Sequence, residues 1–149
     1  MVEIQGPMTA ESLASFLAEP ILARIATIQG DRPHVVPMWF DWDGESIWME
    51  TGYGFRKHKN LLENPNCAVT IDVTEGGLRF KGAILEGVAE IITDTEPFIR
   101  ETVERIYRKY LGDAGILEPT PQEMIANPHA IIRLRPSRIL TWDETGSES

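Results

Sequence analysis

Residues 21–51 read ILARIATIQGDRPHVVPMWFDWDGESIWMET, and this stretch decides the fold. The run ILARIATIQ is rich in β-branched residues, and the letters GDRP then form a turn signature before HVVPMWFDW resumes strand character. The next turn is Asp43-Gly44, the strongest short hairpin signal in the chain, and SIWMET follows it. We therefore expect three antiparallel strands in succession.

Pro37 interrupts the second of these strands. Proline cannot donate to a sheet ladder, so it is confined to edges, bulges or places where the backbone faces something else. Two interpretations follow. The strand is an edge strand in which proline blocks aggregation, or a flat ligand lies against the backbone of Pro37, Met38 and Trp39.

The third strand leads into residues 51–61, TGYGFRKHKNL, where a helix is expected to begin. Arg56, Lys57 and Lys59 lie within four positions, in a chain with 14 Lys/Arg and a net charge of -9. The first turn of a helix presents unpaired N–H groups and the positive end of the macrodipole, which repel cations. A bound phosphate would resolve the conflict, because N–H groups, the Thr51 hydroxyl and basic side chains all bind it. The alternative is a solvated basic face on a surface helix.

Periodicity predicts the remaining elements around this centre. Residues 9–18 and 55–64 are expected to be helices, the first capped by Thr9 and the second with Leu61 and Leu62 inward. Residues 67–73 and 78–92 read as strands, and residues 95–111 as an amphipathic helix that ends at Gly112 and has a solvated charged face. Residues 113–128 read as a surface excursion with a short helical patch, followed by two extended pieces around Pro136 and a disordered tail at 143–149. The expected fold is one domain over residues 1–149, mainly β (α+β), with six or seven mostly antiparallel strands in a small barrel.

Composition excludes several classes of protein. The lone cysteine, Cys67, rules out an internal disulfide and fits a reducing compartment, for which the cytoplasm is the default expectation. No apolar run approaches the length of a membrane span, and the first residues lack a signal-peptide pattern. The excess of acidic residues, 23 against 14 basic ones, argues against nucleic acid as a partner.

Common catalytic motifs are missing from the sequence. There is no nucleophile elbow and no P-loop, and Gly52-Tyr53-Gly54 matches only the first half of a dinucleotide fingerprint. The three histidines are far apart in sequence, which gives no support for a metal site. If the protein is an enzyme, a bound cofactor is expected to supply the chemistry. A cofactor with a phosphate and a flat ring, such as flavin mononucleotide (FMN), would explain both the basic cluster and the proline-interrupted strand, with Trp39 or Trp142 covering the ring.

Residues 22–72, LARIATIQGDRPHVVPMWFDWDGESIWMETGYGFRKHKNLLENPNCAVTID, resemble the flavin-binding split-barrel proteins related to pyridoxamine 5′-phosphate oxidase. The pattern consists of RPHVVPMWF, then T-x-x-x-x-R-K-x-x-N-L, then N-P-x-x-A-V. Further on, KGAILEG at 81–87 resembles the strand that passes the flavin ring, and RPSRILTW resembles the closing strand of the shorter bacterial members. The resemblance covers nearly the whole chain except the two tails and residues 113–128.

The resemblance implies a split barrel, a homodimer with two flavins at the subunit interface, and FMN-dependent oxidoreductase activity on a small organic substrate. It also implies the residues that bind the cofactor. Those that match the family's phosphate ligands are Thr51, Arg56 and Lys57. Those on the strand that contacts the ring and ribityl chain are His34, Val36, Pro37, Met38 and Trp39. Lys81 lies where a flavin-contacting strand begins, and Lys81 or Trp142 is expected to reach the cofactor of the partner subunit.

The sequence departs from the true oxidase at its C-terminal end. The Arg- and His-bearing motif that grips pyridoxine phosphate has no match in RILTWDETGSES, so oxidation of vitamin B6 is not expected. The shorter branch uses FMN or a 5-deazaflavin coenzyme, and His58 and Lys59 are where the longer acidic tail of the deazaflavin would be recognised. A flavin- or haem-binding module without turnover is the third possibility. No catalytic side chain and no substrate can be named from the sequence.

Overall fold

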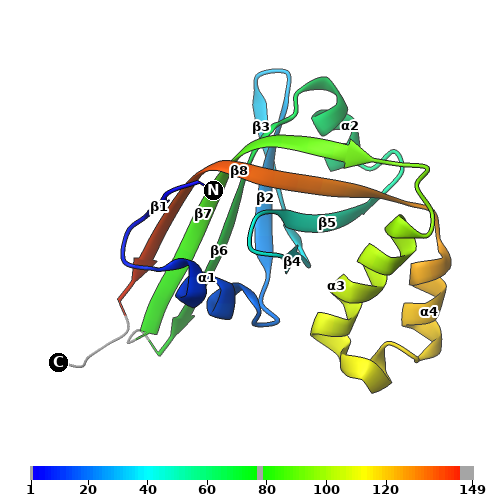
Figure 1. Ribbon diagram of the computed structural model, residues 1–149. Coiled ribbons are helices and arrows are strands. Elements are labelled where there is room, and N and C mark those ends of the chain that lie inside the picture. The colour runs from blue at the N-terminus through cyan, green and yellow to red at the C-terminus, as the bar shows by residue number, and fades with distance from the viewer. Residues whose placement is uncertain (1, 77–78, 145–149) are drawn as a thin grey trace.

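The computed structural model of the protein describes residues 2–76 and 79–144, which form eight strands and four helices (Figure 1). The strands are β1 (Ile4–Gln5), β2 (Ala23–Gln29), β3 (Arg32–Met38), β4 (Asp41–Trp42), β5 (Ile47–Gly52), β6 (Asn66–Glu75), β7 (Arg79–Ile92) and β8 (His129–Asp143). The helices are α1 (Ala10–Leu17), α2 (Arg56–Glu63), α3 (Phe98–Gly115) and α4 (Pro119–Ala126).

All strands belong to one sheet in the order β3-β2-β6-β7-β8-β5-β4, with β1 added to β8. Every pairing is antiparallel except that of β1 with β8. The two longest strands, β7 and β8, cross the whole molecule and join its two halves (Figure 1). This arrangement is the split barrel that the resemblance implies.

The first hairpin follows the predicted pattern, but its turn is shorter. Gly30 and Asp31 alone connect β2 to β3, and Gly30 has a φ of 62°. Glycine with positive φ at the first central position is typical of a two-residue type II′ turn. Pro33 therefore lies within β3 and not in the turn. Because β3 ends the strand order, both Pro33 and Pro37 lie on an edge strand.

The closing strand corrects a second prediction. Residues expected to form two extended pieces around Pro136 form the single strand β8. The proline is accommodated because the register of β7 against β8 shifts between Glu86 and Gly87, so that Gly87 pairs with Pro136. Such a bulge bends and coils the strand, as the glycines in residues 78–92 predicted.

Two short helices position the ends of the barrel. Thr9 caps α1 as expected, forming a capping box with Ser12. The prediction that Leu61 and Leu62 of α2 both point inward is half right, because Leu61 is 2% exposed whereas Leu62 is 62% exposed. The helix has only two turns, so one leucine is sufficient to close the barrel and the adjacent one points to solvent.

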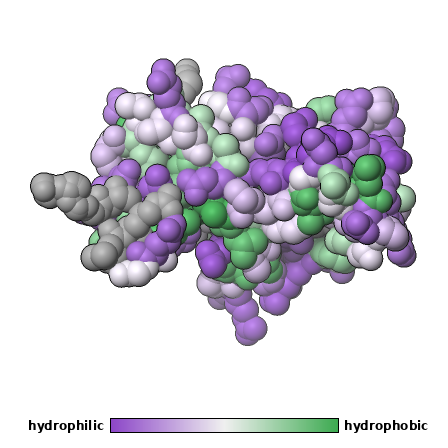
Figure 2. Space-filling view, turned by 90° about the horizontal axis from the view of Figure 1, so that it is seen from below, coloured by the Kyte–Doolittle hydropathy of each residue, from purple (hydrophilic) through white to green (hydrophobic). Residues whose placement is uncertain are grey.

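The barrel interior contains the larger hydrophobic core, and α3 and α4 cover a second one. The second core includes Ile106 of α3, Ile125 of α4 and Ile131 of β8. Residues 113–128 are therefore not a surface excursion, because Ile116 and Ile125 are buried there. The helix α3 passes Gly112 with a local break at φ 77°. Seen from below, hydrophilic residues dominate the surface on the side of these helices, with smaller apolar groups between them (Figure 2).

The helix α3 is anchored by Tyr110, which lies on its apolar stripe, and by Lys109, which the amphipathic pattern does not single out. The Lys109 ammonium donates to the carbonyls of Leu17 (2.7 Å) and Phe40 (3.0 Å), and burial lowers the pKa of Lys109 to about 8. The Tyr110 hydroxyl donates to the carbonyl of Ile21 (2.7 Å) and accepts from the N–H of Phe40 (3.2 Å). Lys109 is thus part of the packing, whereas the sequence predicted that it would lie on a solvated face.

The C-terminal tail was expected to be disordered from residue 143. Asp143 instead ends β8 in register with Lys81, and the N–H of Glu144 donates to the carbonyl of Phe80 at 2.8 Å. Residues 145–149 lie outside the described part of the chain.

Candidate functional site: the start of α2 and the edge of β3

The N-terminus of α2 carries positive charge without a compensating acid. Phe55 occupies the N-cap position, and among the described residues no side chain caps the helix and no acidic residue lies in its first turn. Arg56 and Lys57 are the first two residues of the helix. Free N–H groups, the macrodipole and two cations therefore favour an anion at this point.

The two cations point in different directions. The Arg56 guanidinium donates from Nε and Nη2 to Oε1 of Gln29, at 2.9 Å and 2.7 Å, on the exposed side of the hairpin. The Lys57 side chain is half-buried and turns toward Glu50. Burial lowers the pKa of Lys57, and the negative charge of Glu50 partly offsets this. An anion bound here would lie between two cations that reach it from separate sides.

The loop before α2 is fixed by local hydrogen bonds. The N–H of Gly54 donates to Nδ1 of His58 at 3.1 Å, and Gly54 has a φ of 78°, which favours glycine. The Thr51 hydroxyl is buried and donates to the carbonyl of Gly52 at 3.2 Å. Thr51 and His58 are thus placed in the interior behind the loop, whereas Lys59 is exposed.

The free edge of β3 offers an unusual set of backbone groups. Gln29 and Arg32 close the two-residue hairpin, so residues 33, 35 and 37 are at the positions whose N–H and C=O groups point away from β2. Two of these residues are prolines, which leaves the N–H of Val35 as the only donor on this edge between residues 33 and 37. Carbonyl oxygens are present at all three. A flat ring that carries an N–H donor beside a carbonyl acceptor would match this edge, by donating to one of its carbonyl oxygens and accepting from Val35.

The side chains of β3 alternate as a half-buried strand requires. Val36 and Met38 pack against the barrel core, whereas Val35 and Pro37 are exposed. His34 lies on the inward side, and its Nδ1 is buried without a hydrogen-bond partner among the described residues. An unpaired buried nitrogen is costly, so His34 is suited to accept or donate a hydrogen bond to a ligand.

A cavity of about 210 Å³ connects the end of β3 to the start of α2. The residues that line it are Pro37, Met38, Trp39, Glu50, Lys57, Tyr107 and Met124. The indole of Trp39 stacks on Tyr110 with ring centroids 4.5 Å apart and planes 5° apart, and meets the edge of Tyr107 at 5.4 Å. The structure thus brings three of the predicted ring-contacting residues together with Lys57.

Sequence reasoning missed the far wall of this cavity, which consists of Glu50, Tyr107 and Met124. Glu50 interacts with Tyr107 and with His129, whose Nδ1 is 3.0 Å from the carboxylate. Burial, together with the charge of Glu50 and a hydrogen bond to it, raises the pKa of Tyr107 to about 12. The hydrogen bond to Glu50 also raises the pKa of His129. The only signal in the sequence was the place of Tyr107 on the apolar stripe of α3, which indicated packing alone.

Lys81 and Trp142 form a separate group. Lys81 pairs with Asp143 and Gly82 pairs with Trp142, and the indole lies so close to Gly82 that a Cβ there would clash with it. The Lys81 ammonium lies 5.2 Å from the centroid of the Phe16 ring. Neither residue lines the cavity between β3 and α2.

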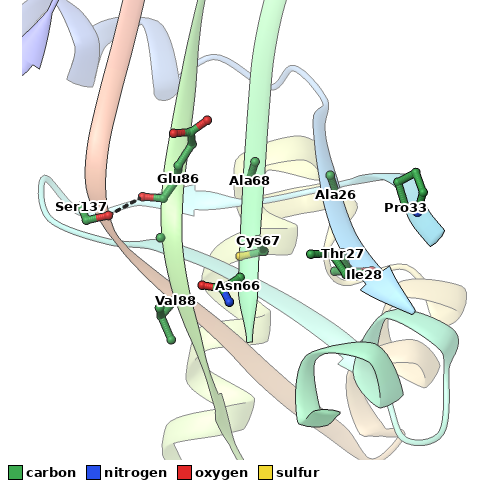
Figure 3. A pocket seen from close by; sticks show the side chains of 11 residues that line it. Ala26, Thr27, Ile28, Pro33, Asn66, Cys67, Ala68, Glu86, Val88 and Ser137 are labelled. Carbon is green, nitrogen blue, oxygen red and sulfur yellow. Dashed lines mark hydrogen bonds between the residues drawn. The ribbon is translucent and has the colours of Figure 1, made fainter. Parts of the chain in front are cut away.

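A larger depression of about 440 Å³ lies on the outer face of β2, β6 and β7 (Figure 3). Ala26, Ala68 and Val88 line it from the three strands, and Pro33 borders it from β3. The Ser137 hydroxyl donates a hydrogen bond to the carbonyl of Glu86 at 3.3 Å (Figure 3). Apolar side chains make up most of the lining of the depression, Glu86 is its charged residue, and none of the described residues that line it is basic like those at the start of α2.

The family model of pyridoxamine 5′-phosphate oxidase matches residues 9–143. The chain belongs to this family. Among curated proteins no sequence matches it.

Solved structures of other proteins share the fold of this family member. A conserved hypothetical protein from Mycobacterium tuberculosis superposes with a TM-score of 0.80 and 26% identity, covering 96% of this chain and 92% of that one. An F420 reductase superposes with a TM-score of 0.65 and 26% identity, covering 84% and 93%. An FAD and haem binding protein from Mycobacterium smegmatis gives 0.71 and 16%, covering 95% and 73%, and is similar in fold alone.

In residues 2–76 and 79–144, no group of three or more His, Cys, Asp or Glu side chains is placed to hold a metal ion. None of the helices in the same residues is long and apolar enough to cross a membrane.

Proposed function

We propose that this family member is an FMN-dependent oxidoreductase that acts on a small organic substrate. The observation that carries the proposal is the uncapped start of α2, where Arg56 and Lys57 are the first two residues of the helix and Lys57 lines one cavity with Pro37 and Met38 of β3. A phosphate fits the first feature, because its oxygens accept from N–H groups and cations. A flat ring fits the second, because the β3 edge presents backbone groups between two prolines.

Different residues of the site would bind different parts of the cofactor. Arg56, Lys57 and the N–H groups of α2 would hold the phosphate, with the Thr51 hydroxyl behind them. The edge of β3 and the side chains of His34, Val36, Pro37, Met38 and Trp39 would hold the ring and ribityl chain. When bound, the flavin supplies hydride exchange with the substrate. The cavity wall of Tyr107 and Met124 leaves room for a small substrate beside Trp39.

The same proposal includes a homodimer with the cofactor at its interface. The outer face of β2, β6 and β7 and the adjoining β3 expose apolar groups, among them Val88 of β7 and Val35 of β3 at 60% and 58% exposure. A second copy covering this face would remove them from water. Lys81 and Trp142 do not reach the α2 cavity within one chain, so their predicted contact with the flavin requires the partner subunit.

Two alternatives differ in the cofactor. A 5-deazaflavin coenzyme is favoured by the 26% identity to an F420 reductase and by the exposed Lys59, which is free to meet an acidic tail. His58 is a weaker candidate for that tail, since it is buried and its Nδ1 is bonded to the loop. A non-catalytic flavin- or haem-binding module is supported by the similarity in fold to an FAD and haem binding protein.

An absorption spectrum of the purified protein separates these cofactors in one measurement. We expect a flavin spectrum, or uptake of added FMN with quenching of its fluorescence. Parallel titrations with the deazaflavin coenzyme then rank the two affinities. Protein that is colourless and takes up no FMN would contradict the leading proposal, and a clear preference for the deazaflavin would replace FMN. Reduction of the bound flavin by NADH or NADPH at catalytic rates would exclude the module without turnover.

Replacement of Arg56 and Lys57 together by Ala tests the phosphate site. We expect FMN affinity to weaken by about 3–6 kcal/mol, since each hydrogen bond to a charged group contributes about 1.5–3 kcal/mol. The matched control is Arg105→Ala with Arg108→Ala, which removes two cations from the exposed surface of α3. Equal affinities for FMN in both double variants would show that the basic residues of α2 form a solvated face and not a phosphate site. A Lys59→Ala variant that weakens only the deazaflavin would favour the alternative coenzyme.

A further inference from the structure

His129 occupies a position between two elements that line the site. It is the first residue of β8, and its side chain is 9% exposed. Nδ1 lies 3.0 Å from Oε2 of Glu50 on β5, and Nε2 lies 2.7 Å from the carbonyl oxygen of Met124 on α4. Both Glu50 and Met124 line the cavity at Lys57. His129 therefore connects Met124, in the last turn of α4, to Glu50 in the far wall of that cavity.

The two partners of His129 require a specific protonation state. A carboxylate and a backbone carbonyl are acceptors only, so both ring nitrogens must carry a hydrogen to satisfy them. A neutral imidazole has one N–H, and its lone pair would then face an oxygen at hydrogen-bond distance. The geometry thus selects the imidazolium. The hydrogen bond to Glu50 raises the pKa of His129 accordingly, although burial opposes this.

Charged groups surround His129 on two sides. On the solvent side, a cavity of about 350 Å³ holds His129 together with Glu96 and Arg100, and the charge of Glu96 also favours the imidazolium. On the inner side, Glu50 separates His129 from Tyr107 and Lys57. Protons can reach His129 from the solvent-side cavity without passing through the cofactor site.

Glu50 is therefore shared between two cations. With His129 charged, the imidazolium neutralises the carboxylate and the charge of Lys57 is left uncompensated in the cavity. With His129 neutral, Glu50 neutralises Lys57 instead. One proton on His129 thus changes the net charge that a ligand meets at Lys57 from positive to zero.

We propose that His129 is a positioning residue that sets the anion affinity of Lys57 through Glu50. The imidazolium holds Glu50 and the Met124 wall in place and leaves Lys57 free for the cofactor phosphate. Loss of the proton leaves Glu50 to neutralise Lys57 and removes one of the two hydrogen bonds by which His129 joins Glu50 to α4. The inference rests on the proposed function for its ligand, because it takes the anion at Lys57 to be the phosphate of FMN.

Titration of the His129 ring by NMR tests the coupling without any ligand. We expect Glu50→Gln to lower the titration midpoint of His129, since it removes the carboxylate. We expect Lys57→Met to raise it, because it removes a cation that faces the same carboxylate. A midpoint that neither substitution moves would overturn the inference, as would shifts of the opposite sign.

The affinity for FMN and for riboflavin, measured by flavin fluorescence between about pH 7 and about pH 9, tests the consequence. This range lies above the second phosphate pKa of about 6, so the charge of FMN stays constant. As the pH rises over this range, we expect FMN affinity to fall about three- to tenfold more in the native protein than in His129→Gln. The reason is that only the native protein loses a unit of positive charge from His129. Riboflavin lacks the phosphate and should show no such difference between the two proteins.

Identical pH dependence of FMN affinity in the native protein and in His129→Gln would overturn the inference. If FMN binds to neither protein at any pH, the proposed cofactor is wrong. The inference is then decided by the NMR titration alone, in which no flavin takes part.

Discussion

The two outer faces of the sheet differ in how they are covered. On the face formed by β5 and β8, the helices α3 and α4 bury Trp48 and Ile131 in a second core. On the face formed by β2, β6 and β7, small and apolar side chains surround an open depression, and Val88 stays 60% exposed. The chain thus supplies its own cover for one face only. The covered face is completed within one chain, whereas the open face keeps apolar side chains exposed.

The largest effect is expected on the covered face. Replacing Ile106 of α3, which is 0% exposed, with Ala should lower the free energy of unfolding by about 2–5 kcal/mol, because it leaves a cavity in the second core. Denaturant unfolding monitored by circular dichroism measures this loss. The control is Leu62→Ala on α2, a 62% exposed side chain whose removal should change stability by less than about 0.5 kcal/mol. Equal losses in both variants would show that α3 does not cover a core.

A smaller effect is expected on the open face, where the quantity that changes is the affinity of self-association and not the stability of the fold. We expect Val88→Lys to weaken self-association about 100-fold, or about 2.7 kcal/mol, because it places a charge in a desolvated contact. Analytical ultracentrifugation across a concentration series measures it. Leu117→Lys is the matched control, since Leu117 is 72% exposed on the side of the helices. A native protein that sediments as a monomer at every concentration would contradict the proposed homodimer.

The smallest effect concerns pH and returns to the covered face. The pKa of His129 is raised in the folded protein, so its contribution to stability is complete below its unfolded pKa of about 6.5 and is lost as the pH rises through the folded pKa. At about pH 5.5 we expect His129→Gln to lower the free energy of unfolding by about 1.5–3 kcal/mol, the usual range for hydrogen bonds to a charged group. The difference between the two proteins should shrink toward pH 9. A difference that stays constant over this range would mean that His129 contributes through packing alone.

Local patterns were sufficient for most of the fold. Gly30 with Asp31, and Asp43 with Gly44, marked two turns because a positive φ or a tight loop restricts the residue types that can occupy them. The errors were of a different kind. Leu62 was expected inside a helix that needs only one buried leucine, and residues 113–128 were expected outside because they contain four turn-prone Gly and Pro residues.

The candidate site also contains both residues that the sequence reveals and residues that it does not. Arg56 and Lys57 stood out because a cation at a helix N-terminus conflicts with the macrodipole, and that conflict is visible in sequence. Glu50 and His129 could not be found, since they are 79 positions apart and each is unremarkable within its own strand.

The sequence by itself determined which residues turn, which alternate, and where basic charge gathers at the start of a helix, because these properties depend on neighbours along the chain. Only the tertiary structure decided that Arg56 and Lys57 point to different sides, that the β3 edge retains a single outward N–H between its prolines, and that one carboxylate is shared by His129 and Lys57. Those features depend on strand register and on packing between distant segments. Charge and hydrogen-bond partners in the folded protein are set by distance in space, which no local pattern specifies.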